Sequence, residues 1–299
     1  MSLTVSLSYI IATRNRLPFL KITLERLVME LQPDEEIVVV DGSSDDGSKE
    51  YLQGLFEVGK IHQLISEPDK NQAHAWNKAM LMAKGTILKK IIDDDVFCYP
   101  AIRQCKNFML VNPAVDVIIS NDLGCNLHEY KKIQKGSRLS QFEKWKNGVT
   151  PSFTFGDVHM LIRRCALAYI GLYSTGYVMM DWEYSLRTSY RQANIVYYTG
   201  YNALSVAHPG NVSSSKNRRL ITEQGEKGAL IYEYKGDRAE ISLWSKMKIQ
   251  AGKRLRPKSE NDSIDDGLPV ENIDTIYSYL YDYIDGINHM QEFTFLEKV

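Results

Sequence analysis

The chain has 299 residues, of which 44% are hydrophobic and 24% charged, and these fractions are close to those of ordinary soluble globular proteins. They argue against a disordered or fibrous protein. Lysine and arginine total 36 against 37 aspartate and glutamate, and this balance argues against a protein whose main partner is nucleic acid.

The cysteines and the apolar runs indicate the compartment. The four cysteines show neither close pairing nor the spacing of zinc ligands, and a chain of this size does not need disulfide bonds to fold. No apolar run approaches the roughly 20 residues that span a bilayer, and the stretch through Ile11 lacks a basic flank and a small-residue cleavage site. We therefore expect a cytoplasmic protein that is neither secreted nor membrane-spanning.

The first third of the chain alternates between strand and helix patterns. A β-rich run at 5–11, a helical pattern at 17–31 and an apolar run at 37–40 indicate a βαβ unit. Continuous apolar runs suit buried parallel strands. The alternation continues with two more helices and two more strands, expected at 48–56, 61–66, 73–83 and 86–92. The pattern predicts a doubly wound α/β sheet.

The rest of the chain is less regular. A helix is expected from Pro100 to Val111 and a strand at 115–121, after which the pattern becomes polar and irregular. A helix at 177–192 and a short strand at 195–198 follow. We divide the chain into a first half at 1–120, a second half at 121–220, and a helical extension at 221–299 with a charged linker near 256–270.

The extension ends in an amphipathic helix. Its apolar residues recur at helical spacing and are Ile273, Ile276, Tyr277, Leu280, Ile284 and Ile287. An isolated helix of this length is marginal in water, so this stripe must pack on something. The acidic residues of the segment disfavour an anionic membrane surface. We expect packing on the chain's own body first and on a second copy next, which corresponds to a monomer or a homodimer.

Three consecutive aspartates, Asp93, Asp94 and Asp95, directly follow the strand expected at 86–92. They stand at the carboxyl edge of the predicted sheet, where ligands of such folds collect. Adjacent carboxylates repel one another, and a divalent cation clamped between them and a diphosphate relieves that repulsion. A solvated acidic turn is the plain alternative, but the position at a strand end favours a metal site.

Two more strand ends bring polar groups to the same edge. Asp41 ends the second expected strand and precedes a turn at 42–47; its carboxylate can accept a hydrogen bond from a base or ribose, or the turn can simply cap the next helix. The first strand ends at 12–16, where Arg14 and Arg16 can meet phosphate or ribose or remain solvated. The three strand ends predict one pocket.

In order and spacing, these motifs resemble those of family 2 glycosyltransferases. The resemblance covers roughly the first hundred residues and rests on Ala12-Thr13-Arg14-Asn15-Arg16, Val39-Val40-Asp41-Gly42-Ser43, Asn77-Lys78-Ala79 leading to Ala83-Lys84-Gly85, and Asp93-Asp94-Asp95. Ala12 stands where the family usually has proline, which leaves the turn less rigid but removes no chemical group. The resemblance implies a GT-A fold, with a Rossmann-like, mostly parallel central sheet flanked by helices, to which a helical C-terminal tail is added here.

The resemblance also implies that the first half, 1–120, binds the nucleotide sugar and that the second half, 121–220, binds the acceptor and carries the catalytic base. Asp41 is expected to read the nucleobase, usually uracil. Asp95 is expected to ligate Mn²⁺ or Mg²⁺ directly. Asp69 equally suits a cap of the helix at 73–83. The remaining residues expected to bind the nucleotide sugar are Thr13, Arg14, Asp69, Asn71, Asp93 and Asp94.

In the second half, the segment 177–187 resembles the family segment in which an acidic residue opens a helix with an arginine downstream. Asp181 matches the catalytic base, which takes the proton of the acceptor hydroxyl while its oxygen attacks the anomeric carbon opposite the departing diphosphate. Glu183 is the rival, and Met180 replaces the other acid of the usual pair. Asp181 also suits a structural role as an N-terminal helix residue favoured by the helix dipole.

Two histidines and a tryptophan complete the candidate site. His208 resembles a late histidine that completes the metal shell in some family members, and a neutral imidazole suits manganese. A lone loop histidine is more often not a ligand. His159 and Trp182 are candidates for acceptor contact, or for pocket-wall and core roles.

The function implied is a metal-dependent, inverting, hexosyltransferase-like glycosyltransferase. It would move a sugar from a nucleoside diphosphate sugar to an acceptor hydroxyl, with a UDP-sugar as first choice and dTDP- and GDP-sugars left open. A sugar or lipid-linked sugar acceptor from polysaccharide or glycan biosynthesis would bring this cytoplasmic enzyme to the cytoplasmic face of the membrane, as a peripheral protein.

Two rival functions remain. A nucleotidyltransferase also uses a doubly wound sheet, carboxylates and magnesium, but it normally has a glycine-rich phosphate loop after the first strand, and 12–16 contains no glycine. A non-catalytic nucleotide-sugar-binding protein that kept the fold would lose its metal site or its base. The intact acidic triplet disfavours that rival.

Overall fold

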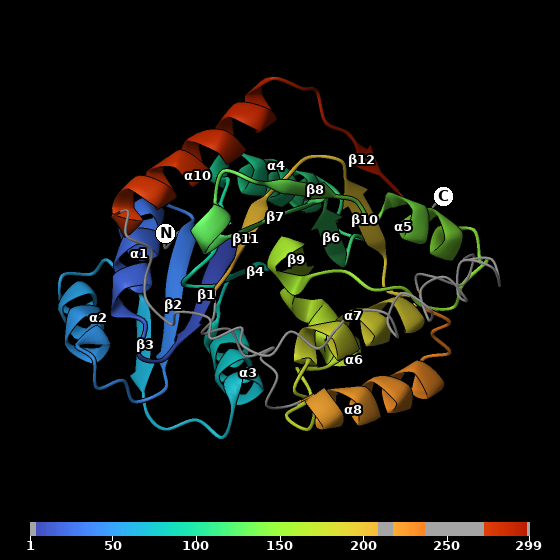
Figure 1. Cartoon of the computed structure of the whole chain (residues 1–299), viewed down its shortest axis with the longest axis horizontal. Coiled ribbons are helices and arrows are strands. Elements are labelled where there is room, and N and C mark those ends of the chain that lie inside the picture. Colours follow the sequence, from blue (N-terminus) through green and yellow to red (C-terminus); the bar gives the residue numbers. More distant parts are fainter. Residues whose placement is uncertain (1–3, 209–217, 237–271, 298–299) are drawn as a thin grey trace, which may run out of the picture.

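The computed structural model describes residues 4–208, 218–236 and 272–297. A central eight-stranded sheet crosses the molecule, with strand order β12-β10-β6-β9-β4-β1-β2-β3 (Figure 1). β9 runs antiparallel to both of its neighbours and β12 runs antiparallel to β10, whereas the other pairs are parallel. The strands are β1 (Leu7–Thr13), β2 (Glu35–Asp41), β3 (Gln63–Ser66), β4 (Ile87–Ile91), β6 (Val117–Ser120), β9 (Met160–Arg163), β10 (Ile195–Tyr198) and β12 (Phe295–Leu296).

Helices cover both faces of the sheet. The expected helices of the first half are confirmed to within a few residues at each end. The α-helices are α1 (Leu17–Glu30), α2 (Ser48–Glu57), α3 (Gln72–Met82), α4 (Tyr99–Val111), α5 (Leu139–Lys146), α6 (Leu167–Ile170), α7 (Met180–Tyr190), α8 (Arg218–Ile231) and α10 (Ile273–His289), and the 3₁₀ turns are η1 (Leu127–Glu129), η2 (Asp157–His159) and η3 (Arg164–Ala166).

The alternation of side chains along the strands builds two cores. On β1, Tyr9 and Ile11 point into the core that contains buried residues of α1, α4 and α10, whereas Ile10 points into the core that contains buried residues of α3 and α7. On β4, Ile87 and Leu88 divide in the same way. Because both faces are covered, the strands read as continuous apolar runs, as expected for buried parallel strands.

The middle of the chain is more regular than the sequence pattern predicts. It supplies β9 to the central sheet and two strands, β7 (Asp122–Asn126) and β8 (Gln134–Gly136), to a smaller four-stranded sheet. That sheet is completed by β5 (Val96–Phe97) and β11 (Ala203–Ala207). These strands have five residues or fewer, and β7 and β8 carry polar or exposed residues. The short apolar runs of β5, β9 and β11 are too brief to be told from turns or helix segments by periodicity. Since β9 and β10 share a sheet with the first half, the division at residue 120 stays a functional prediction.

The C-terminal helix packs on the chain's own body. The buried face of α10 is formed by Ile276, Tyr277, Leu280, Tyr281, Ile284 and Ile287, which join the core of α1 and α4. This confirms the expected intramolecular docking, while the oligomeric state stays a prediction. The linker expected near 256–270 lies outside the described residues. None of the helices in the described ranges is both long and apolar enough to cross a bilayer.

Strand β4 carries two consecutive buried lysines, Lys89 and Lys90, on opposite faces of the sheet. Lys89 Nζ donates to the carbonyl oxygen of Val158 and, over 3.2 Å, to Asn202 Oδ1. Burial lowers the pKa of Lys89 from 10.5 to about 7. The unfolded chain therefore binds more protons than the folded one between pH 7 and 10.5, so this lysine makes the free energy of unfolding rise with pH in that window.

We predict that Lys89→Met removes this pH dependence. From pH 7.5 to 9, the free energy of unfolding of the wild type should rise relative to that of the variant by up to about 1.4 kcal/mol per pH unit. Urea unfolding of both proteins across this range measures the difference. Parallel pH profiles would show that Lys89 keeps an ordinary pKa in the fold.

Candidate active site

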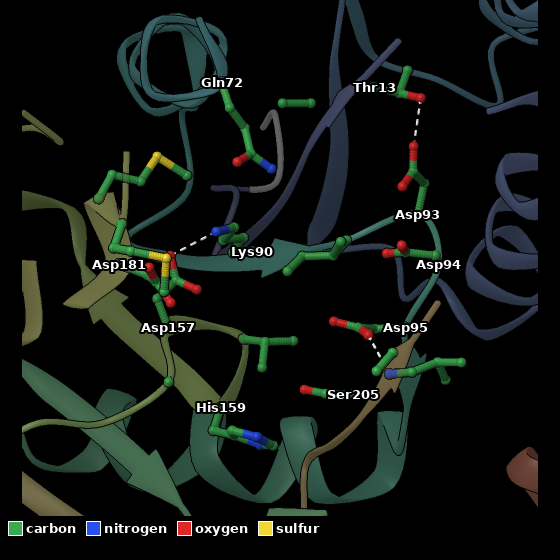
Figure 2. Close-up of a pocket in the computed structure, with 18 of the residues that line it drawn as sticks. Thr13, Gln72, Lys90, Asp93, Asp94, Asp95, Asp157, His159, Asp181 and Ser205 are labelled. Atoms are coloured by element: carbon green, nitrogen blue, oxygen red, sulfur yellow. Dashed lines mark hydrogen bonds and ion pairs between the residues drawn. The ribbon is translucent and has the colours of Figure 1, made fainter. Parts of the chain in front are cut away.

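A cavity of about 910 Å³ opens where β1 and β4 of the central sheet end, next to β7 and β11 of the smaller sheet. The register explains part of this arrangement, because Thr13 on β1 pairs with Asp41 on β2 and Ile11 pairs with Ile91 on β4. The three strands therefore end together, and the residues after them meet. The opposite wall is formed by η2 and by the first turn of α7 (Figure 2).

All three aspartates of the triplet are buried and line this cavity. Thr13 Oγ1 donates to Asp93 Oδ2 over 2.6 Å, and the backbone N–H of Val206 donates to Asp95 Oδ1 over 2.7 Å. Burial, together with the charge of Asp94, raises the pKa of Asp93 to about 7 and that of Asp95 well above its ordinary value. Asp93 and Asp95 therefore hold a proton more readily than exposed aspartates do, because the fold compensates their negative charges only in part.

Asp94 differs from its neighbours because Arg16 and His208 contact it. Arg16 Nη1 forms an ion pair with Asp94 Oδ2, and His208 Nε2 lies 2.6 Å from the same oxygen and 3.0 Å from Arg16 Nη1. Burial would raise the pKa of Asp94, but the hydrogen bond from His208 and the charge of Arg16 lower it overall. His208 also stacks on Phe19 of α1, with ring centroids 5.1 Å apart.

The backbone of the acidic turn is held from two helices. Thr23 Oγ1 of α1 donates to the carbonyl oxygen of Asp93 over 2.8 Å. The hydroxyl of Tyr277 on α10 donates to the carbonyl oxygen of Asp94 over 2.5 Å. Both hydroxyls are buried, so the turn is fixed by hydrogen bonds that water does not compete for.

Of the other residues expected to bind the nucleotide sugar, Arg14, Asp69 and Asn71 line the cavity. Asp69 Oδ1 forms a 2.7 Å ion pair with Lys78. Asn71, rather than Asp69, is the N-cap of α3, where its side chain accepts a hydrogen bond from the backbone of His74. The side-chain amide of Asn71 also donates to the carbonyl oxygen of Thr175 over 2.8 Å.

Asp41 is placed differently from the sequence expectation. Its carboxylate is fully buried beneath the cavity and accepts hydrogen bonds from the backbone and hydroxyl of Ser44 and, over 2.6 Å, from the hydroxyl of Ser66. The neighbouring Gly42 lines the cavity instead, where an added Cβ would lie 3.2 Å from the side chain of Arg14. Direct contact of Asp41 with a nucleobase therefore stays a prediction that needs these serines to release it.

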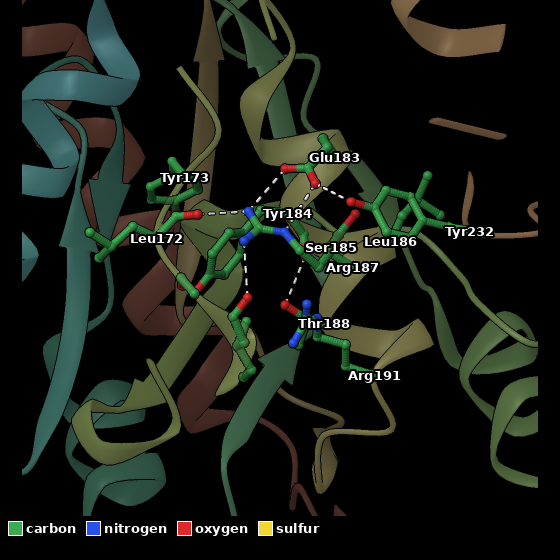
Figure 3. Close-up of polar contacts among 12 residues, drawn as sticks. Leu172, Tyr173, Glu183, Tyr184, Ser185, Leu186, Arg187, Thr188, Arg191 and Tyr232 are labelled. Carbon is green, nitrogen blue, oxygen red and sulfur yellow. Dashed lines mark hydrogen bonds and ion pairs between the residues drawn. The ribbon is translucent and has the colours of Figure 1, made fainter. Parts of the chain in front are cut away.

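The two candidates for the base occupy different environments. Asp181, in the first turn of α7, lines the cavity, and burial together with the charge of Asp157 raises its pKa. Glu183 is buried behind the helix, where Arg187 contacts its two carboxylate oxygens over 3.0 Å each and the hydroxyl of Tyr232 donates to it (Figure 3). Glu183 therefore holds α7 in place, while Asp181 is the carboxylate that a substrate can reach.

Arg187 also fixes the loop before α7. Its guanidinium donates to the carbonyl oxygens of Ile170 and Leu172, over 2.9 and 2.7 Å (Figure 3). The arginine six residues after Asp181 thus ties the helix that begins with Asp181 in its first turn to the segment packed against it. Trp182, a candidate for acceptor contact, is instead close to Gly228 of α8, where an added Cβ would lie 2.6 Å from its ring.

The structure adds residues that the sequence analysis does not single out. Lys90, Asp157, Asp122 and Arg138 line the same cavity, together with His159. Burial lowers the pKa of His159 to about 4, so this imidazole is neutral at pH 7. In the sequence, the signal for a functional Lys90 is the presence of two consecutive lysines inside an apolar strand. Asp157 follows Gly156 shortly before a short strand, and in the sequence such a Gly-Asp pair cannot be told from an ordinary turn.

The chain offers suitable donors for a divalent cation but no preformed cage. Carboxylate oxygens of Asp94 and Asp95 and the imidazole of His208 belong to the ligand types that manganese and magnesium sites use. Within the described ranges, no three His, Cys, Asp or Glu side chains converge as a metal site. Arg16 and His208 both contact Oδ2 of Asp94, so this oxygen is already engaged in the absence of a cation.

Known proteins share sequence features and the fold with this chain. The family model described as Glycosyl transferase family 2 matches residues 8–171, which is more than half of the chain. No curated protein sequence matches. The solved structure of residues 1–349 of TarS from S. aureus in complex with UDP-GlcNAc is 15% identical, with a TM-score of 0.59 over 78% of this chain and 67% of that one. The same TarS fragment in another structure is 16% identical, with a TM-score of 0.53 over 82% and 68%.

A third solved structure is the mannosyltransferase PcManGT from Pyrobaculum calidifontis in complex with GDP-Man and Mn²⁺. It is 16% identical, with a TM-score of 0.48 over 95% of this chain and 86% of that one. At the identities of the TarS structures, the likeness establishes the fold alone. The expected GT-A fold is confirmed.

Proposed function

The chain belongs to glycosyltransferase family 2, and we propose that it transfers a sugar from a UDP-sugar to an acceptor hydroxyl with inversion at the anomeric carbon. The observation that carries this proposal is the single cavity that has the acidic triplet on one side and Asp181 on the other (Figure 2). An inverting transfer needs the leaving diphosphate and the base on opposite faces of the transferred sugar.

Asp181 is the proposed base. Burial raises its pKa, so its carboxylate takes up a proton more readily than an exposed aspartate would. The acceptor oxygen forms its bond to the anomeric carbon as the bond from that carbon to the diphosphate oxygen breaks. The acceptor proton passes to Asp181, and the electron pair of the broken bond leaves with the diphosphate.

The negative charge of the leaving group needs compensation at the other end of the cavity. We propose that Asp95, with Asp94 and His208, holds Mn²⁺ or Mg²⁺. When bound, the cation supplies Lewis-acid stabilisation of the diphosphate. Asp93 is held by Thr13, and Arg16, which pairs with Asp93 and Asp94, is proposed as a second cationic group for phosphate.

The nucleotide and acceptor assignments rest on position. Arg14, Asp69 and Asn71 line the cavity near the ends of β1 and β2 and are proposed to bind the nucleoside. Uracil is proposed from the family resemblance of Asp41. A sugar or lipid-linked sugar is the proposed acceptor, and a cytoplasmic, peripheral location goes with it. The nucleotidyltransferase alternative stays disfavoured by the glycine-free turn at 12–16.

A thermal-shift comparison of nucleoside diphosphates tests the donor class. UDP, dTDP, GDP and ADP are each added with and without manganese. We expect UDP with manganese, at about 100 times its Kd, to raise the midpoint by roughly 5 °C, because a ligand that binds only the folded state stabilises it. A larger shift with GDP would overturn the uracil assignment, and equal shifts without manganese would overturn the metal assignment.

A further inference from the structure

Lys90 and Asp157 form a buried ion pair in the wall of the cavity. Lys90 Nζ lies 2.6 Å from Asp157 Oδ2 (Figure 2). The hydroxyl of Tyr173 donates to the same oxygen over 2.7 Å. Lys90 is 5% exposed and Asp157 is 3% exposed. The ammonium group also lies 4.5 Å from the centre of the ring of Trp76, a cation–π contact that helps to hold it.

Stability alone does not account for this pair. Removing two charges from water costs about as much as their attraction returns, and apolar residues of similar volume would stabilise the core as well. The carboxylate is also only half used. A carboxylate offers about four acceptor positions, and both hydrogen bonds here go to Oδ2. Within the described part of the chain, Asp157 Oδ1 accepts no hydrogen bond, although the residue lines the cavity.

The location of Asp157 narrows what its free oxygen can bind. Asp157 lies in η2, which contacts α7, and both Asp157 and Asp181 line the same side of the cavity (Figure 2). The anomeric carbon must lie between the diphosphate at the triplet and the oxygen that Asp181 deprotonates. The ring of the transferred sugar therefore lies along the wall that Lys90 and Asp157 form. Its hydroxyls are hydrogen-bond donors, which suit a carboxylate oxygen.

We infer that Asp157, held by Lys90 and Tyr173, binds a hydroxyl of a sugar through Oδ1 and thereby determines which sugar the enzyme accepts. The inference rests on the proposed function and extends it from the nucleotide to the sugar. The sugar of the donor is the first source of that hydroxyl. A sugar acceptor next to Asp181 presents the same chemistry, and the two sources are distinguished by experiment.

Calorimetric titration compares UDP with UDP-glucose, UDP-galactose and UDP-GlcNAc, in the presence of manganese. In the wild type, the affinity ratio between each UDP-sugar and UDP isolates the contribution of the sugar. Asp157→Asn should lower this ratio about tenfold for the preferred sugar, the scale of one lost hydrogen bond to a charged group, and leave the affinity for UDP unchanged. In a second arm, free glucose, galactose and GlcNAc are titrated into the UDP-bound protein, and loss of that binding in the variant identifies an acceptor sugar as the source.

Two further variants keep the test decisive. Tyr173→Phe removes one hydrogen bond from Oδ2 without changing any charge, and it should lower the same ratio by a smaller factor, about threefold. Asp116→Asn is the matched control, because Asp116 also accepts a hydrogen bond from a tyrosine, Tyr169, but does not line the cavity. It should change neither affinity.

The outcomes separate the two proposals. A wild type that binds no nucleoside diphosphate would overturn the proposed function and this inference together. A variant Asp157→Asn that binds UDP normally and shows unchanged ratios in both arms would overturn the inference alone. Loss of UDP affinity in Asp157→Asn and Tyr173→Phe alike would also overturn it, because the pair would then support the nucleotide site rather than the sugar.

Discussion

Asp181→Asn is expected to lower turnover by roughly a hundredfold or more, the scale of a lost general base, while the affinity for the nucleotide sugar stays within about twofold. Asparagine has the same shape and keeps the start of α7 intact, but it cannot accept the acceptor proton. Turnover is measured as release of UDP with a competent acceptor, and affinity by calorimetry. The pair of measurements separates chemistry from binding.

Glu183→Gln provides the contrast. Because Glu183 pairs with Arg187 and accepts from Tyr232 inside the protein, this change should lower the free energy of unfolding, by about 1.5–3 kcal/mol, rather than remove the base. Near-normal turnover of Asp181→Asn, combined with loss of turnover in folded Glu183→Gln, would transfer the role to Glu183. The direction of the pKa shift adds a check: the acid limb of kcat/KM should lie above the ordinary pKa of aspartate, 3.8.

Asp95→Asn is expected to remove most of the manganese-dependent part of UDP affinity, at least about tenfold, a loss typical of a damaged metal site. The amide keeps an oxygen that can accept from the backbone N–H of Val206, so the contact that holds this residue in place persists. Repulsion within the triplet also falls, so stability should not suffer. Calorimetry of UDP binding with manganese and with a chelator measures the effect.

Asp122→Asn is the matched control for that experiment. Asp122 lines the same cavity but lies on β7, where Arg138 pairs with it over 3.3 Å. Its change should leave the manganese dependence intact. Equal manganese dependence in wild type and Asp95→Asn would show that Asp95 is not a metal ligand.

The sequence predicts the first half of the fold well because both faces of its strands are buried. Runs such as Val38 to Val40 are then continuous and their ends are marked by polar residues. The acidic triplet is predictable for the same reason, since it follows the apolar end of β4 with only Ile92 between them. The antiparallel strand β9 is not predictable from the sequence. It has four residues and ends in Arg163, which is followed by Arg164, so it is too short to carry a periodic signal.

The contacts within the site are less accessible to sequence than the positions around it. The pattern places Asp41 at a strand end but does not show that Ser44 and Ser66 occupy its carboxylate. Glu183 and Asp181 are two residues apart, and only the packing of α7 separates the structural acid from the reachable one. The ion pair of Lys90 with Asp157 joins residues that are 67 positions apart, so no local sequence motif predicts it.

Strand β12 has a consequence for the synthesis of the protein. It pairs antiparallel with β10 at the edge of the central sheet, and Phe295 stacks on Phe108 of α4 with ring centroids 4.1 Å apart. During synthesis, residues 273–296 leave the ribosome after all the remaining strands of that sheet have already emerged. Until then β10 is an open edge with unpaired backbone groups, the kind of surface on which nascent chains pair with one another. Slow emergence of this segment should therefore favour aggregation during expression, even though the finished fold hides that edge.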